Sequence, residues 1–133
     1  VSGYTCMNDV TDREAQSKDG QWVRSKSYDT YGPIGPRIVP ASEIGDPHNL
    51  KIEARLNGKT VQSSNTSNLI FSIPFLISYI SARITLEPGD VITTGTPHGV
   101  GAFSKPPVFM KAGDVIEVEI EKIGILRNKV VGA

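Results

Sequence analysis

The stretch Leu50–Gln62, LKIEARLNGKTVQ, is the clearest structural signal in the chain. Leu50, Ile52, Ala54 and Leu56 alternate with polar residues, which is typical of a strand with one buried face. Asn57-Gly58 follows and favours a tight turn in which both residues take positive φ. The segment therefore predicts a β-hairpin, and this hairpin sets the expectations for the rest of the fold.

After the hairpin the apolar spacing changes from every second residue to helical spacing. The segment 70–84 carries apolar residues three or four positions apart, with Ser72 as a candidate N-cap and Pro74 in the first turn. Glu87-Pro88-Gly89-Asp90 ends the pattern. We therefore predict one substantial helix between Ile70 and Ile84.

The remaining elements are predicted to be short and mostly extended. Thr11-x-x-Glu14 is a capping-box pattern, so we expect a short helix to begin after Asp9. Strands are expected at Thr5–Met7, Arg37–Pro40, Val91–Thr94, Val115–Ile120 and Leu126–Val131. The fold class is therefore α+β and mostly β, in a single domain over residues 1–133.

Composition excludes some classes of partner. Lys and Arg together number 14, as do Asp and Glu, so charge gives no case for binding nucleic acid or an anionic membrane surface. The apolar segment Leu69–Ile84 is too short and too polar to span a bilayer. Cys6 is the single cysteine, so we expect no internal disulfide and a reducing, cytoplasmic location. The chain starts at Val1 in strand-like sequence, and we expect a piece of a longer protein.

Four polar stretches fall at strand ends or in loops, where functional sites are usually built: Asn8-Asp9, Arg24–Thr30, Gln62–Thr66 and Thr94–Thr96. Asp9 raises the sharpest question, because a carboxylate at the end of an apolar strand is costly to bury unless a positive group meets it.

Each stretch also has a purely structural interpretation. Asp9 could cap the helix that Thr11 opens, and Lys26 could be an ordinary solvated lysine. Asn65-Thr66 could cap the helical region 70–84. Gly95–Gly101 could be only a turn, since glycines there permit unusual backbone angles without any ligand.

Taken together and in order, these stretches resemble the catalytic domain at the C-terminus of the fumarylacetoacetate hydrolase family. The matching segments are Tyr4-Thr5, Asn8–Val10 with Arg13, Lys26–Pro33, Gln62–Thr66, Pro88–Ile92, Thr94–Pro97, Gly99–Gly101, Lys105–Pro107 and Gly113-Asp114. The resemblance covers essentially the whole chain.

The resemblance implies a mixed β-sheet roll, or partly open barrel, with a site for Mg²⁺, Mn²⁺ or Ca²⁺. In that comparison Asp9 matches a metal-binding aspartate, Thr30 lies near the metal, and Lys26 matches the active-site lysine. The positions implied to contact substrate are Arg13, Gln16, Asn65, Thr66, Gly95 and Thr96, and Thr96 matches a threonine that binds a substrate carboxylate.

The chain departs from the family pattern at the metal. The family's Glu-x-Glu pair appears here only as Glu117-Val118-Glu119, near the C-terminus, on a strand that we expect to face solvent. The family's own pair and its catalytic histidine would precede Val1. We therefore expect the isolated chain to be inactive.

Two functions follow as expectations. The first is a divalent-metal-dependent enzyme acting on 2-oxo or 1,3-dicarbonyl acids, by C–C bond hydrolysis, decarboxylation or isomerisation through an enolate, and working as a homodimer. The alternative is a non-catalytic truncated domain that is retained for fold or assembly.

Overall fold

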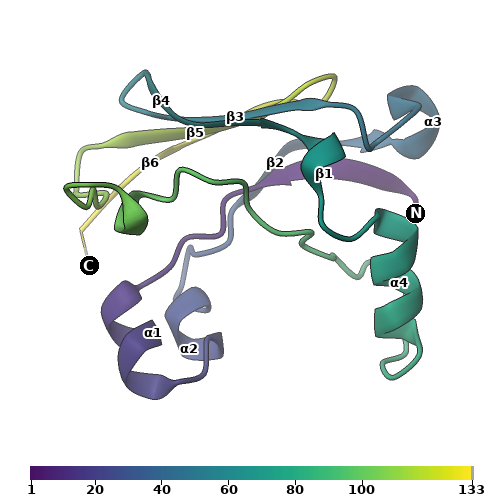
Figure 1. The fold of residues 1–133 in the computed structure, drawn as a ribbon, viewed down its shortest axis with the longest axis horizontal. Helices are drawn as coiled ribbons and strands as arrows, with labels where there is room; N and C mark the ends of the chain where they lie inside the picture. Colours follow the sequence, from purple (N-terminus) through teal and green to yellow (C-terminus); the bar gives the residue numbers. More distant parts are fainter. Residues whose placement is uncertain (133) are drawn as a thin grey trace.

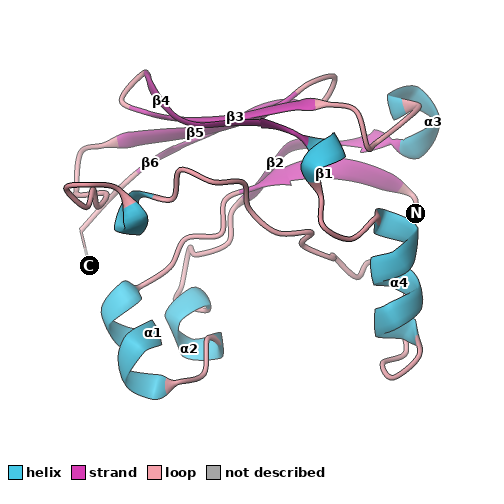
Figure 2. Cartoon of the chain, in the orientation of Figure 1, coloured by secondary structure: helices cyan, strands magenta, loops and turns pink. Residues whose placement is uncertain are grey.

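A computed structural model describes residues 1–132, in which two antiparallel sheets lie side by side and short helices lie to one side of them (Figures 1 and 2). The strands are β1 (Gly3–Met7), β2 (Ile34–Pro40), β3 (Lys51–Leu56), β4 (Lys59–Asn65), β5 (Val115–Ile120) and β6 (Gly124–Lys129). The helices are α1 (Arg13–Asp19), α2 (Val23–Lys26), α3 (Ala41–Ile44) and α4 (Ile73–Ser81), with 3₁₀ turns η1 (Thr66–Asn68) and η2 (Gly101–Phe103).

The predicted hairpin is confirmed and forms half of the larger sheet. β3 and β4 pair antiparallel with Leu56 opposite Lys59, and the turn residues Asn57 and Gly58 have φ of 52° and 79°. Positive φ at both positions matches the right-handed twist of the strands. β5 pairs with the other edge of β3, and β6 pairs with β5, which gives the order β4-β3-β5-β6.

The core lies where the β1–β2 sheet meets β5 and β6. β1 and β2 both contact β6, and β1 also contacts β5. The buried cluster is made of Cys6, Val39, Ile44, Leu50, Ile123 and Leu126. Cys6 is fully buried, and its burial raises the pKa of the thiol. The predicted fold class, α+β and mostly β, is confirmed.

The helix predicted between residues 70 and 84 is confirmed in a shorter form. α4 covers Ile73–Ser81, its N-cap Ser72 accepts a hydrogen bond from the Phe75 amide, and Pro74 lies in the first turn. α4 has no buried residue, and Phe71, Phe75 and Tyr79 stack along its exposed surface. Among residues 1–132 no helix is long and apolar enough to cross a membrane.

Three details of the sequence prediction were wrong. The cap of α1 is Asp12, whose carboxylate accepts from the Ala15 amide, and not Thr11. Val91–Thr94 forms no strand: Val91 is 58% exposed, and the segment runs as a connection from α4 towards η2 (Figure 1). α2 and α3 were not predicted, and neither has a side-chain cap bond that a sequence pattern would reveal.

Candidate functional site

The Asp9 carboxylate is met by the amino group of Lys26. Asp9 follows β1, and Lys26 is the last residue of α2. The Lys26 amino group donates to the Asp9 carboxylate and, over 3.1 Å, to the hydroxyl of Thr11. The side chains are 25% exposed for Lys26 and 48% for Asp9. Lys26 is thus a partly desolvated partner of Asp9, and Asp9 does not cap α1.

The backbone between β1 and α2 fixes the position of Lys26. The Asp12 amide donates to the Ser25 carbonyl over 2.9 Å, which ties the start of α1 to α2. Ser25 is fully buried, and its hydroxyl donates to the Trp22 carbonyl over 2.8 Å. The Lys26 amino group also lies 5.8 Å from the centre of the Trp22 ring, within the range of a cation–π interaction. A carboxylate, a hydroxyl and an aromatic ring therefore surround the lysine ammonium.

Arg13 and Gln16 lie together on α1. The Arg13 guanidinium donates to the Gln16 side-chain oxygen over 2.7 Å and lies 5.5 Å from the centre of the Phe103 ring in η2. Residues far apart in sequence thus meet at this point, and α1 is linked to the segment that follows the glycine-rich loop. The two residues are close enough to act on one ligand.

No hydrogen bond in the described part of the chain joins the other predicted site residues to Asp9. Thr30 is exposed with φ of 70°, and no hydrogen bond in the described part of the chain joins it to Asp9 or Lys26. Asn65 caps η1 through the Ser67 amide rather than the helix at 70–84. The Thr66 hydroxyl accepts from the Leu50 amide over 2.9 Å. Asn65 and Thr66 thus serve the local structure at the end of β4.

The glycine-rich loop Gly95–Gly101 is held by a residue that the sequence prediction did not name as a site residue. The Gln62 side-chain nitrogen lies 3.1 Å from the Thr96 hydroxyl and 2.7 Å from the Pro97 carbonyl. The sequence placed Gln62 at the start of a polar stretch and of a segment that matches the family, and these were the signals that could have pointed to it. Gly95 and Thr96 remain exposed, so the loop is accessible to a ligand.

A divalent ion finds too few protein ligands in this chain. Within residues 1–132 no three His, Cys, Asp or Glu side chains are grouped to hold a metal ion. Asp9 offers one carboxylate. Beside it the Asn8 side-chain nitrogen is buried without a hydrogen-bond partner, and an amide turned the other way would present its oxygen instead. The residues present therefore fit a hard cation only in part.

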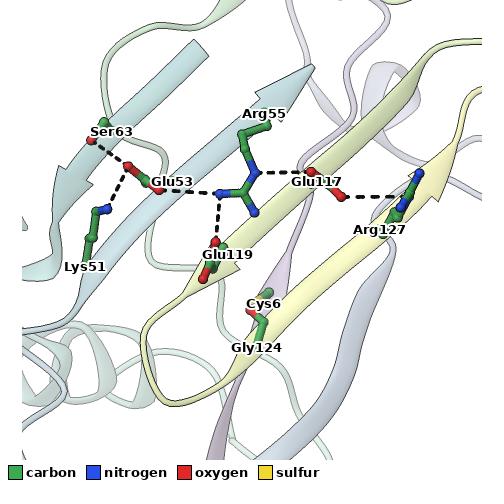
Figure 3. Close-up of polar contacts among 9 residues, drawn as sticks. All are labelled: Cys6, Lys51, Glu53, Arg55, Ser63, Glu117, Glu119, Gly124 and Arg127. Atoms are coloured by element: carbon green, nitrogen blue, oxygen red, sulfur yellow. Dashed lines mark hydrogen bonds and ion pairs between the residues drawn. The ribbon is translucent and has the colours of Figure 1, made fainter. Parts of the chain in front are cut away.

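The carboxylates of Glu117 and Glu119 form ion pairs with arginine side chains (Figure 3). Arg55 donates to Glu117 over 3.1 Å and pairs with Glu119 over 2.7 Å, and Arg127 lies 3.8 Å from Glu117. These two carboxylates raise the pKa of Arg55. The Glu117 side chain is only 19% exposed, so the expectation that this strand faces open solvent was wrong for Glu117. Glu117-Val118-Glu119 is an ion-pair ladder and not a metal pair.

An apolar groove lies away from these residues. It has a volume of about 650 Å³ and is lined by Val1, Tyr4, Pro47, His48 and one side of α4. His48 accepts a hydrogen bond from the Ile73 amide over 3.0 Å through its ring nitrogen, so it is half-buried and holds the start of α4.

Known proteins that resemble this chain in sequence share the fold described above. A mitochondrial oxaloacetate tautomerase of Rattus norvegicus is 51% identical over 132 residues, which are 98% of this chain and 42% of that protein. A fumarylacetoacetate hydrolase from psychrophilic Exiguobacterium antarcticum is 44% identical with a TM-score of 0.96, over 100% of this chain and 48% of that one. A 5-carboxymethyl-2-hydroxymuconate delta-isomerase from Mycobacterium smegmatis is 45% identical with a TM-score of 0.87, over 98% and 48%.

The chain spans about half the length of the curated relatives that it matches, from 42% to 51%. The model of the fumarylacetoacetate hydrolase C-terminal domain matches residues 1–131, which is almost the whole chain. On this match and these identities, the chain belongs to the fumarylacetoacetate hydrolase family.

Proposed function

We propose that this chain is part of an enzyme that acts on 2-oxo or 1,3-dicarbonyl acids by C–C bond hydrolysis, decarboxylation or isomerisation. The observation that carries the proposal is the Lys26 amino group, partly desolvated and fixed between Asp9, Thr11 and Trp22. The names of the relatives support the same class of substrate, since they include an oxaloacetate tautomerase and a hydroxymuconate isomerase.

Lys26 is proposed as the catalytic residue. When a carbon–carbon bond breaks, or a proton moves next to a carbonyl, negative charge develops on the substrate oxygen. A fixed ammonium stabilises that charge more than mobile water does, because it needs no reorganisation during the reaction. Asp9 and Thr11 hold the ammonium in one orientation, since both accept hydrogen bonds from it.

We further propose that Asp9 contributes one oxygen to a bound Mg²⁺, Mn²⁺ or Ca²⁺ and that Thr30 lies near this ion. Hard cations prefer carboxylate and water oxygens, and the other protein ligands would come from outside residues 1–133. Such an ion, when bound, polarises the carboxylate and the neighbouring oxo group of an acid. Because the ligand set is incomplete here, the role proposed for Lys26 does not depend on it.

The substrate is proposed to lie between α1 and the glycine-rich loop. Arg13 and Gln16 would contact it from α1, and the Gly95–Thr96 segment would bind a carboxylate. The contact between Arg13 and Phe103 supports this placement, because it joins α1 to the segment after that loop. Asn65 and Thr66 are proposed to support the site from the end of β4.

The test compares residues 1–133 with the complete protein encoded by the reading frame that contains them. Oxaloacetate tautomerisation, oxaloacetate decarboxylation and acylpyruvate hydrolysis are assayed with Mg²⁺ and Mn²⁺, before and after treatment with a chelator. We expect metal-dependent turnover of an oxo acid by the complete protein and none by the isolated chain.

The alternative function, a non-catalytic domain retained for fold or assembly, is favoured by the lack of a three-ligand group in residues 1–132. It predicts that the complete protein turns over none of the acids with any of these metals.

We also propose that the protein is a homodimer and that it works in a reducing compartment such as the cytoplasm. The exposed stack of Phe71, Phe75 and Tyr79 supports an apolar contact, and the single cysteine supports the compartment. Light scattering of the complete protein should give twice the mass of one subunit. A monomer at high concentration would contradict the dimer.

A further inference from the structure

The side-chain amide of Gln62 holds three consecutive residues of the glycine-rich loop. Gln62 lies on β4, an edge strand of the larger sheet. Its nitrogen lies 2.7 Å from the Pro97 carbonyl oxygen, 3.1 Å from the Thr96 hydroxyl and 3.3 Å from the His98 carbonyl oxygen, so its two hydrogens are shared among three acceptors. One amide group therefore organises a loop that lies 34 to 36 residues further along the chain.

The loop is also in close contact with the backbone of β4. Gly99 has φ of 96°, and a Cβ atom at this position would collide with the carbonyl oxygen of Val61, the residue before Gln62. Only glycine fits at such a close approach. The loop is thus seated on β4 by its backbone and bonded to it by Gln62, so the position of Thr96 is set from two sides.

The chemistry of these contacts fixes the direction of the Thr96 hydroxyl. The Pro97 and His98 carbonyls accept hydrogen bonds only, so the nitrogen of Gln62, and not its oxygen, must face them. An amide nitrogen donates and does not accept, so the Thr96 oxygen must accept from it. The single hydroxyl hydrogen of Thr96 then points away from Gln62, and Thr96 is exposed.

We propose that Gln62 is a positioning residue that presents the Thr96 hydroxyl as a donor and makes the loop selective for a substrate carboxylate over a carboxamide of the same shape. This inference rests on the proposed function, in which an oxo acid lies against Gly95 and Thr96. A carboxylate accepts hydrogen bonds at both oxygens, whereas a carboxamide accepts at one and presents hydrogens at the other. A donor fixed in the loop discriminates between them.

The kinetic test uses Gln62→Met in the complete protein, with oxaloacetate and with 2-oxosuccinamate, in which the carboxylate remote from the oxo group is a carboxamide. Methionine keeps the length of glutamine and removes the donor. We expect KM for oxaloacetate to rise about 10-fold or more, the usual effect of losing a hydrogen bond to a charged group, with kcat little changed. KM for 2-oxosuccinamate should stay close to the wild-type value. Gln21→Met, at an exposed glutamine, is the matched control.

A double-mutant cycle separates positioning from general support of the fold. In a Thr96→Val background the hydroxyl is absent, so Gln62→Met should have no further effect on KM for oxaloacetate. If Gln62 acts only as a structural anchor, Gln62→Met lowers activity towards both acids equally, and does so in either background. That result would overturn the inference.

A binding measurement on the complete protein tests the inference without turnover. In ¹H–¹⁵N spectra the amide signals of Gly95, Thr96 and Gly99 should shift with succinate at lower concentration than with succinamate. Gln62→Met should abolish this difference. A wild-type protein that responds equally to both would refute the inference on Gln62. Selective binding in a complete protein that turns over no oxo acid would refute only the proposed function.

Discussion

Lys26 donates a hydrogen bond to Asp9, a residue 17 positions earlier in the chain, although each side chain could have remained in solvent. The pair joins the end of β1 to the end of α2, and Trp22 lies beside it. The proposed chemistry requires a lysine ammonium that is fixed in place and still reachable by substrate, and the half-exposed pair of Lys26 and Asp9 provides one.

Lys26→Ala in the complete protein should lower kcat by about 10²- to 10³-fold, the effect seen when a donor to a developing oxyanion is removed. Asp9→Ala should abolish activity, since the proposed metal loses a ligand and Lys26 loses its partner. The control is Lys18→Ala, because Lys18 is 68% exposed and pairs only with Glu14. Steady-state kinetics with oxaloacetate measures all three. A fall in activity for Lys18→Ala equal to that for Lys26→Ala would argue against a specific role for Lys26.

Mg²⁺ should bind the isolated chain weakly or not at all. Asp9 supplies one carboxylate, and Mg²⁺ gives up its water reluctantly. Trp22 is the single tryptophan and lies 5.8 Å from the Lys26 amino group, so its fluorescence reports on this site. We expect no saturable change in fluorescence on adding millimolar Mg²⁺ to the chain, and a saturable change in the complete protein. Saturation in the isolated chain that disappears in Asp9→Asn would mean that this chain completes the metal site itself.

Asp114 should make the stability of the chain depend on pH in acid. Its carboxylate accepts from the Asn57 side chain and the Lys111 amide, both over 2.9 Å, and these bonds lower the pKa of Asp114. A lowered pKa stabilises the folded state above the ordinary value of about 4, and the stabilisation is lost as the pH falls through the lowered value.

Urea unfolding at neutral pH and near pH 3 checks this dependence. Asp114→Asn should be less stable than wild type at neutral pH, and its unfolding free energy should fall less on acidification. Asp29→Asn, at an exposed aspartate, should follow the wild-type curve. Parallel curves for Asp114→Asn and wild type would contradict the assignment.

Arg55→Met should destabilise the fold more than Arg127→Met. Arg55 is 19% exposed and contacts Glu53, Glu117 and Glu119, so its removal leaves three neighbouring carboxylates without their shared cation. Arg127 is 67% exposed and contacts Glu117 at 3.8 Å. Thermal unfolding at low and high salt measures the difference, which salt should reduce by screening the carboxylates. Equal effects of the two substitutions would mean that the ladder adds no stability at its centre.

The elements that the sequence predicted correctly are those with local causes. The Asn57-Gly58 turn and the Ser72 cap depend on residues within a few positions, so their patterns are legible in the chain. Val91–Thr94 has strand-like composition but gains no neighbouring strand, and composition alone cannot reveal a missing partner. α2 begins at Val23, its N-cap Trp22 makes no side-chain cap bond, and the helix lies in contact with α1, which no local pattern reveals.

The contacts of the candidate site also divide into those that the sequence predicted and those that it did not. The expectation that a positive group meets Asp9 is confirmed by its contact with Lys26. The expected contact between Asp9 and Thr30 is not found among the hydrogen bonds of residues 1–132. Gln62 was missed because its partners lie in a loop 34 or more residues away, and no local pattern encodes that distance. The roles of these residues in catalysis and binding stay predictions.

The packing of β1 against β5 and β6 has a consequence for the synthesis of the protein. The Cys6 thiol lies 3.5 Å from the carbonyl oxygen of Gly124, a separation of 118 residues along the chain. On the ribosome β1 emerges before β5 and β6 and must wait for them, while the β3–β4 hairpin can already form with the β3 edge open. The nascent chain therefore depends on being kept from pairing with other chains until β5 and β6 have been synthesised.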